Sequence, residues 1–189
     1  PVREEGSCGA SYAYAALSAI EGQLLIKKKL NVTLSWQQIL DCSSSYGNNG
    51  CSGGLMTNCF NYAHDKGLTT EAAYPYTATT GKCKINTGQY KVLSYTEVPA
   101  GSCNGLTNAL SQGPVSIAVD AFQIQSYHSG ILKCKTPSTA SSGALMVGQN
   151  DTAWKVQMNF GRTWGMEGYI YLAPGNSCNV CDYACIPQI

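Results

Sequence analysis

The sequence predicts an α+β fold, with helices in the first half of the chain and strands in the second. Residues 11–28 place apolar side chains at the 3.6-residue period of a helix, and lysines close the segment at the end that favours positive charge. Short β-type runs bounded by Gly, Pro, Asn or Ser appear only from residue 115 onward. Helices first and strands later favour α+β over alternating βαβ units.

Local patterns predict the individual elements. The 11–28 segment is expected to be a buried central helix. A second helix is predicted over residues 35–41, with Ser35 as its N-cap, and a third over residues 56–64. Strands are predicted at residues 115–120, 143–148, 154–158 and 169–172. The Ser/Thr-rich stretches 77–80 and 136–142 are expected to be surface loops.

Size and charge limit the classes of protein. The 189 residues, 44% of them hydrophobic, are enough for the core of one domain or of two small subdomains. The formal net charge is +1, and the largest basic cluster is the run Lys27-Lys28-Lys29 at the end of the predicted first helix. We therefore expect a solvated helix end there and no nucleic-acid partner. The sequence has no transmembrane run, so no membrane partner is expected either.

The cysteine content indicates the compartment. Ten cysteines in a chain of this length favour an oxidising environment, either secreted or lumenal and lysosome-like. Two Asn-X-Thr sequons, at Asn31 and Asn150, fit the same compartment. The chain begins abruptly at Pro1, and we expect a leader and some N-terminal residues of the folded domain to precede it.

Several ordered motifs carry a family resemblance. The segment from Glu5 to Tyr14 is similar to the papain-family signature Q-G-x-C-G-S-C-W-A-F. Residues 34–42 resemble the family's L-S-E-Q-x-L-V-D-C, and residues 50–56 its G-C-x-G-G-L-M. The match continues in register through residues 74–76, 113–121, 161–169 and 178–189. The chain thus resembles a cathepsin L-like member of the papain family over essentially its whole length.

The resemblance implies an architecture. It assigns residues 1–96 to a mainly helical left subdomain and residues 97–189 to a β-barrel-like right subdomain, with the C-terminal segment returning to the left half. A substrate cleft is expected between the two subdomains.

The resemblance also implies three disulfides, which are Cys8–Cys51, Cys42–Cys83 and Cys134–Cys178. It leaves Cys59, Cys103, Cys181 and Cys185 without assigned pairs. The spacing of Cys178, Cys181 and Cys185 is also compatible with metal ligands. A second pair of ligands with matching spacing is missing, however, so additional disulfides are favoured. We expect no metal and no cofactor.

The family's peptidase chemistry requires a cysteine thiolate, a histidine, an asparagine and a glutamine that donates to the oxyanion. These positions fall on Ser11, Ser142, Met158 and Glu5. A serine hydroxyl is far less acidic than a thiol, and an ionised glutamate can only accept hydrogen bonds. We therefore expect all four positions to be vestigial and peptidase activity to be absent.

Other interpretations of these positions remain open. The two histidines, His64 and His128, do not align with the catalytic strand, and both are expected at the surface, although His128 is kept as a candidate base. Ser11 is also explained as the N-cap of the long helix. The two interpretations of Ser11 differ in geometry, because a nucleophile needs a base within roughly 2.6–3.2 Å.

A second resemblance suggests a function. The stretch Cys8-Gly9-Ala10-Ser11-Tyr12-Ala13 is similar to the C-G-A-S-Y-A of the silicateins, the papain-fold proteins of sponge spicules. Silicateins also carry a serine-rich tract before the catalytic histidine, as this chain does at residues 136–142. The resemblance implies a structural or templating role in biosilica filaments, secreted or vesicular, with like chains or silica as partner. Silica-condensing activity stays open, and hydroxyl groups at residues 43–46, 77–80 and 136–142 are the candidate contacts.

Two alternatives come from other classes of function. One is a non-catalytic homologue that binds peptides or inhibitors in the cleft. The residues proposed to line that cleft are Gly53, Gly54, Leu55, Met56, Trp164 and Tyr183. A buried turn with core contacts explains residues 53–56 equally well. The other alternative is an active cathepsin L-like cysteine peptidase, which requires that the natural residues at the triad positions differ from those in this sequence.

Overall fold

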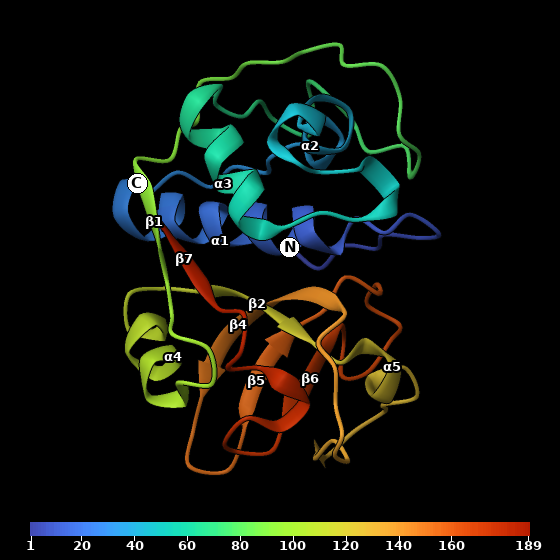
Figure 1. Ribbon diagram of the computed structural model, residues 1–189, viewed down its shortest axis with the longest axis vertical. Coiled ribbons are helices and arrows are strands. Elements are labelled where there is room, and N and C mark those ends of the chain that lie inside the picture. Colours follow the sequence, from blue (N-terminus) through green and yellow to red (C-terminus); the bar gives the residue numbers. More distant parts are fainter. The chain divides into compact units, whose positions relative to one another are not determined.

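The computed structural model describes residues 1–189, and the chain divides into two compact units. The helical unit comprises Glu5–Thr96 and Pro187–Ile189, and the sheet unit comprises Pro1–Glu4 and Glu97–Ile186. Figure 1 shows the helices of the helical unit and most of the strands in the sheet unit. The predicted α+β class is confirmed. None of the helices combines the length and the apolarity that a membrane span requires.

The helical unit contains the three helices that the sequence predicts. They are α1 (Ser11–Lys28), α2 (Trp36–Cys42) and α3 (Met56–Asp65), with short 3₁₀ turns at Ser44–Tyr46 and Gly50–Ser52. α2 begins as expected, because the Ser35 hydroxyl oxygen accepts a hydrogen bond from the Gln38 N–H at 3.1 Å. The same hydroxyl donates to the Tyr74 carbonyl at 2.6 Å and so ties the start of α2 to a distant loop.

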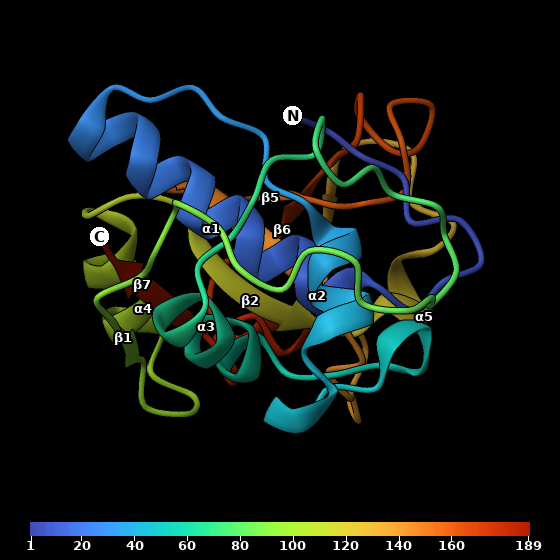
Figure 2. The same ribbon diagram turned by 90° about the horizontal axis from the view of Figure 1, so that it is seen from above.

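α1 forms the centre of this unit. Every residue from Ser11 to Glu21 is buried, and both α2 and α3 pack against the helix (Figure 2). Alanine recurs along this buried stretch, and its small side chain lets neighbouring helices approach closely while keeping a high helix propensity. The helix ends at Lys29, which adopts the left-handed conformation with φ 58°. Residues 27–29 are exposed, as expected for a solvated helix end.

The strands form a seven-stranded sheet with the order β1-β7-β2-β4-β5-β6-β3, of which β2 to β6 lie wholly within the sheet unit. The pairs β2–β4, β4–β5 and β5–β6 are antiparallel, and β3 runs parallel to β6. The strands are β1 (Ser94–Glu97), β2 (Val115–Val119), β3 (Ile131–Leu132), β4 (Ser142–Gln149), β5 (Trp154–Gln157), β6 (Tyr169–Leu172) and β7 (Cys185–Gln188). Helices α4 (Cys103–Leu110) and α5 (Ala121–Ile124) complete the unit.

Some of these elements were not expected from the sequence. The patterns did not indicate α4, α5, β1, β3 or β7, all of which are short. Ser142, expected in a loop, is the first residue of β4, where it pairs with Val119 of β2. The remainder of 136–142 and all of 77–80 lie outside helices and strands.

Four disulfides link the chain. The structure contains the three pairs that the family resemblance implies, Cys8–Cys51, Cys42–Cys83 and Cys134–Cys178. It adds a fourth, Cys103–Cys181, whose cysteines are 78 residues apart. Cys59 and Cys185 are buried and lie outside the disulfides. Metal ligation by the cluster Cys178, Cys181 and Cys185 is therefore wrong for this structure, because two of its three thiols are consumed by disulfides.

Candidate functional site

Ser11, at the nucleophile position, is the first residue of α1 and is 9% exposed. The N-cap residue is Ala10, whose own side chain makes no capping hydrogen bond. The interpretation of Ser11 as the cap is therefore wrong, because the helix begins one residue earlier than that interpretation requires. The first turn of α1 carries no acidic residue of its own, so its backbone N–H groups need an acceptor from elsewhere.

Glu5, at the predicted oxyanion position, supplies an acceptor to the N-cap residue just before the helix, whose N–H it shares with the Cys8 carbonyl at 2.8 Å. Its carboxylate Oε2 accepts a hydrogen bond from the Ala10 N–H at 3.1 Å. The positive end of the helix dipole favours a negative charge at this point. A family member that stabilises an oxyanion needs hydrogen-bond donors here, whereas the carboxylate offers only acceptors and a negative charge. Glu5 thus makes the start of α1 unfavourable for a second anion.

Tyr76 anchors Glu5 from the opposite side. Its hydroxyl donates to the Glu5 carbonyl at 2.6 Å. Burial raises the pKa of Tyr76 to about 12, and the nearby carboxylates of Glu5 and Glu71 add to the shift. The phenol therefore stays protonated at neutral pH and acts as a donor rather than a base.

Neither histidine is placed as a buried base. His64 lies on α3, its side chain is 58% exposed, and its Nδ1 is 2.9 Å from the Asp65 carboxylate. It is the one histidine in the helical unit, which also contains Ser11. His128 belongs to the sheet unit and is exposed in the loop between α5 and β3. Both therefore lie at the surface, as expected.

The predicted histidine and asparagine positions, Ser142 and Met158, carry side chains without an imidazole or an amide. Ser142 opens β4 and is partly exposed. Met158 directly follows β5, is fully buried, and belongs to the apolar cluster of the sheet unit. A thioether is a weak acceptor with no proton to donate, so Met158 does not orient an imidazole as an amide does.

Asn159, the residue after Met158, was missed by the sequence reasoning. Its side chain is fully buried, and neither its Nδ2 nor its Oδ1 has a hydrogen-bond partner within the protein. Successive side chains in extended chain point to opposite sides, so this amide is not a substitute for one at position 158. The only feature of the sequence that could have drawn attention to Asn159 is that it is an asparagine directly after position 158, where the family motif has its asparagine.

The glycine-rich candidates for peptide binding differ from one another. A Cβ on Gly54 would lie 2.6 Å from the Tyr12 ring, so this glycine is required by close packing. Gly53, in contrast, has φ +111° and open space around it. Leu55 is 61% exposed, and Met56 is the first residue of α3. The buried-turn interpretation therefore fits Gly54 and fails for Leu55.

The two aromatic candidates belong to the sheet unit. The Trp164 indole donates to the Gln125 carbonyl at 3.0 Å and meets Phe160 edge to face at 5.1 Å. Tyr183 is largely exposed. Trp164 is therefore held in place by its own unit, whereas Tyr183 is presented to solvent.

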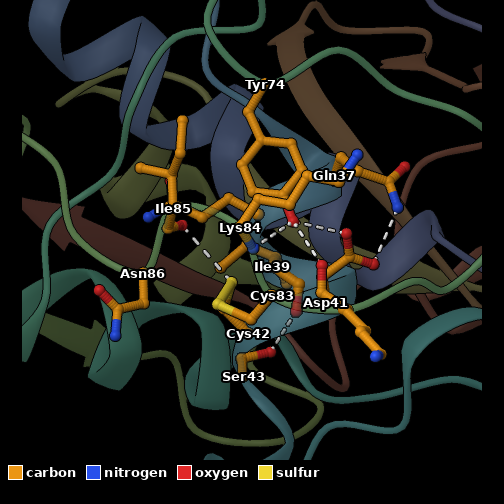
Figure 3. Close-up of a disulfide and its surroundings, with 12 residues drawn as sticks. Gln37, Ile39, Asp41, Cys42, Ser43, Tyr74, Cys83, Lys84, Ile85 and Asn86 are labelled. Atoms are coloured by element: carbon orange, nitrogen blue, oxygen red, sulfur yellow. Dashed lines mark hydrogen bonds between the residues drawn. A yellow bond between two sulfur atoms is a disulfide. The ribbon is translucent and has the colours of Figure 1, made fainter.

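A cavity of about 520 Å³ lies beside the Cys42–Cys83 disulfide in the helical unit, and nothing in the sequence indicated it (Figure 3). The Asp41 carboxylate accepts from the Tyr74 hydroxyl at 2.6 Å and from the Gly81 N–H at 2.7 Å. Burial, followed by this bond to Asp41, raises the pKa of Tyr74 to about 12. Because both carboxylate oxygens are engaged by the protein, Asp41 braces the loop rather than offering a vacant charge.

The two-unit α+β fold, the disulfide pattern and the sequence motif at the start of α1 are together typical of one protein family. The chain belongs to the papain family of cysteine proteases, whose family model matches residues 1–188.

Among known proteins, the chain is similar to cathepsins L. It is 39% identical to cathepsin L 2 of Paramecium tetraurelia, over 98% of this chain and 59% of that protein. It is 37% identical to a cathepsin L-like proteinase of Fasciola hepatica, over 100% of this chain and 61% of that protein. The chain thus spans about 60% of the length of these curated relatives.

Comparison with solved structures also finds cysteine proteases. Digestive procathepsin L 3 from the larval midgut of Tenebrio molitor matches with a TM-score of 0.93 and 36% identity, over all of this chain and 66% of that one. The cysteine protease CMS1MS2 of Carica candamarcensis, solved with E-64, matches with a TM-score of 0.94 and 27% identity, over 100% and 92% of the two chains. The papain-like fold is confirmed.

Proposed function

We propose that this chain is a non-catalytic papain-family protein that acts as a structural or templating protein in biosilica filaments, as the silicatein-like motif around Ser11 suggests. The observation that carries the loss of peptidase chemistry is the Glu5 carboxylate hydrogen-bonded at the N-terminus of α1. A negative charge there opposes an alkoxide on Ser11 and an oxyanion on a substrate. The buried Met158 adds to this, since it removes the amide that orients the family's histidine.

Exposed hydroxyl groups support the templating role. A hydroxyl both donates and accepts, so it is able to pair with a silanol. Several side chains in the candidate loops use their hydroxyls internally; the Ser43 hydroxyl donates to the Ile39 carbonyl, and the Ser138 hydroxyl to the Asp120 carboxylate. Others are exposed, and their hydroxyls make no hydrogen bond within the protein: Ser44, Ser45, Thr79, Thr136 and Thr139. The proposal therefore narrows the silica contacts to these five.

Silica condensation on the purified protein tests this function. The amount of precipitated silica and the formation of filaments are measured for the natural protein, for Ser11→Ala, and for a variant with alanine at all five exposed hydroxyl positions. We expect Ser11→Ala to match the natural protein and the five-position variant to lose silica deposition. Ser129→Ala, an exposed serine outside the candidate loops, is the matched control. Absence of both condensation and filaments in the natural protein would rule the proposal out.

Peptide binding is a second candidate function, and the exposure of Leu55 next to the open Gly53 favours it. An extended peptide needs room for its backbone and an apolar contact; the open space beside Gly53 supplies the first and the exposed Leu55 side chain the second. Titration calorimetry with a cystatin-type inhibitor measures this directly. Binding that is weakened by Leu55→Ala supports it, and no heat at micromolar protein concentration excludes it.

Peptidase activity is a third candidate function, because the similar proteins are named as cathepsin L and a cathepsin L-like proteinase. It requires a cysteine at position 11, so mass spectrometry of the natural peptides that contain Ser11, Ser142 and Met158 comes first. We expect these residues as they stand in the sequence, and no hydrolysis of a fluorogenic peptide. Hydrolysis that a thiol-reactive epoxide blocks would instead establish a cysteine peptidase.

A further inference from the structure

The C-terminal end of α1 exposes an apolar surface that the proposed function does not use. Leu25 is 51% exposed, Ile26 46% and Leu30 43%, and we call these three residues the α1-end patch. The N–H of Leu30 donates to the Leu24 carbonyl at 3.2 Å, which folds the chain after α1 back onto the helix end. These three aliphatic side chains are exposed within six residues at one helix end, and neighbouring exposed apolar residues favour a cover more than a single one does.

The residue that follows the patch is Asn31, the acceptor of the sequon Asn31-Val32-Thr33. Asn31 is exposed, and its side chain makes no hydrogen bond within the protein. The N–H of Glu71 donates to the Thr33 carbonyl at 2.9 Å, which fixes the chain just beyond the sequon. Consecutive Cα atoms are 3.8 Å apart, so the Asn31 amide lies within one residue of Leu30 and within a sugar's length of the patch.

We propose that Asn31 carries an N-linked glycan whose first sugars cover the α1-end patch. In the transfer, the Asn31 Nδ2 forms a bond to C1 of the sugar and loses a proton, while the bond from C1 to the diphosphate of a lipid-linked oligosaccharide breaks and the diphosphate keeps the electron pair. The four disulfides place the chain in the oxidising compartment where that donor is found. A pyranose ring presents C–H groups on one side and hydroxyls on the other, so it covers aliphatic carbon and remains hydrated.

The second sequon shows what distinguishes Asn31. Asn150 lies in the turn between β4 and β5, and its Oδ1 accepts from the Thr152 N–H at 2.9 Å, the Thr152 hydroxyl at 2.8 Å and the Ala153 N–H at 2.8 Å. Its side chain is part of the turn, and its exposed neighbours Asp151 and Thr152 are polar. A sugar at Asn150 has no apolar surface to cover, whereas one at Asn31 does.

The test uses the protein secreted from eukaryotic cells behind a secretory leader. Glycosidase treatment in heavy-oxygen water, followed by peptide mass spectrometry, marks an occupied Asn31 as aspartate. Thr33→Ala destroys the sequon and leaves Asn31 in place, and Thr33→Ser is the matched control that keeps it. Light scattering with size-exclusion chromatography measures self-association of both variants.

We expect an occupied Asn31, a Thr33→Ser protein with the size of the natural one, and self-association of Thr33→Ala at least ten-fold stronger. Adding Leu25→Ser, Ile26→Ser and Leu30→Ser to Thr33→Ala should reverse the association, and these exposed positions tolerate serine without loss of core packing. An unmodified Asn31 in the secreted protein would overturn the proposal. Equal association of Thr33→Ala and Thr33→Ser would also overturn it. Neither the mass spectrometry of Asn31 nor the measurement of self-association involves silica, so these experiments test the glycan independently of the proposed function.

Discussion

The Cys103–Cys181 disulfide gives the sharpest prediction about stability, because the family resemblance did not imply it. The disulfide joins residues 78 apart in sequence, but it encloses the Cys134–Cys178 disulfide, which bridges 44 residues of the same loop. In the unfolded chain, the shortest path between Cys103 and Cys181 therefore has about 35 residues. The chain-entropy relation then gives about 3.8 kcal/mol of stabilisation at 25 °C, against about 4.5 kcal/mol for a loop without the inner link.

We expect the variant Cys103→Ala/Cys181→Ala to lose about 4 kcal/mol of unfolding free energy, measured by guanidinium chloride unfolding of the oxidised protein and followed by circular dichroism. Cys185→Ala is the control, because it removes a buried sulfur of the same unit without removing a cross-link. A loss in the double variant no larger than in Cys185→Ala would refute the entropic reasoning. The same comparison is then made in a protein that lacks the Cys134–Cys178 disulfide. There, removal of Cys103–Cys181 should lower the unfolding free energy by about 0.7 kcal/mol more than it does when Cys134–Cys178 is present.

Three further predictions concern single residues. Gly54→Ala should destabilise the protein by about 2 kcal/mol in thermal melts, because the new Cβ meets the Tyr12 ring at 2.6 Å, and an unchanged melting temperature would contradict the close packing. Glu5→Gln should cost roughly 1 kcal/mol of unfolding free energy near neutral pH, since the helix start loses its negative charge; a gain in stability would disprove the capping role. Burial raises the pKa of Asp120, but hydrogen bonds from Gln123, Thr139 and Ser138 outweigh this and lower it. Its contribution to stability should therefore be present above pH 4 and disappear as the pH falls through the lowered value, and Asp120→Asn should flatten the melting temperature between pH 5 and pH 3.

The sequence predicted the elements that carry strong local patterns. The apolar character of residues 11–28 and the capping serine at position 35 located α1 and α2, although α1 is buried on every side over residues 11–21 rather than along the single stripe that was predicted. β3 has only two residues, and α5 has four, so neither offers enough periods to detect. Those elements exist because of pairing with β6 and packing against the sheet, which a local pattern does not contain.

The assignment of the candidate site residues rests on the sequence motifs and stays a prediction, whereas their contacts could be seen only in the structure. The motif register assigned Ser11, Glu5 and Met158 to family positions, and the acceptor-only chemistry of Glu5 followed from its side chain. The hydrogen bond from the Ala10 N–H to Glu5 did not, because it depends on where α1 begins, and helix boundaries are the least predictable feature of a helix. The fully buried amide of Asn159 likewise depends on three-dimensional packing rather than on spacing along the chain.

The carboxylate at the start of α1 also limits how this lineage can change. A cysteine restored at position 11 would face the charge of Glu5, which raises a thiol's pKa and leaves it protonated and unreactive. A glutamine restored at position 5 alone would weaken the helix start and gain no nucleophile. If the proposed non-catalytic function is correct, neither substitution alone is therefore expected to produce a peptidase, and several would be needed together.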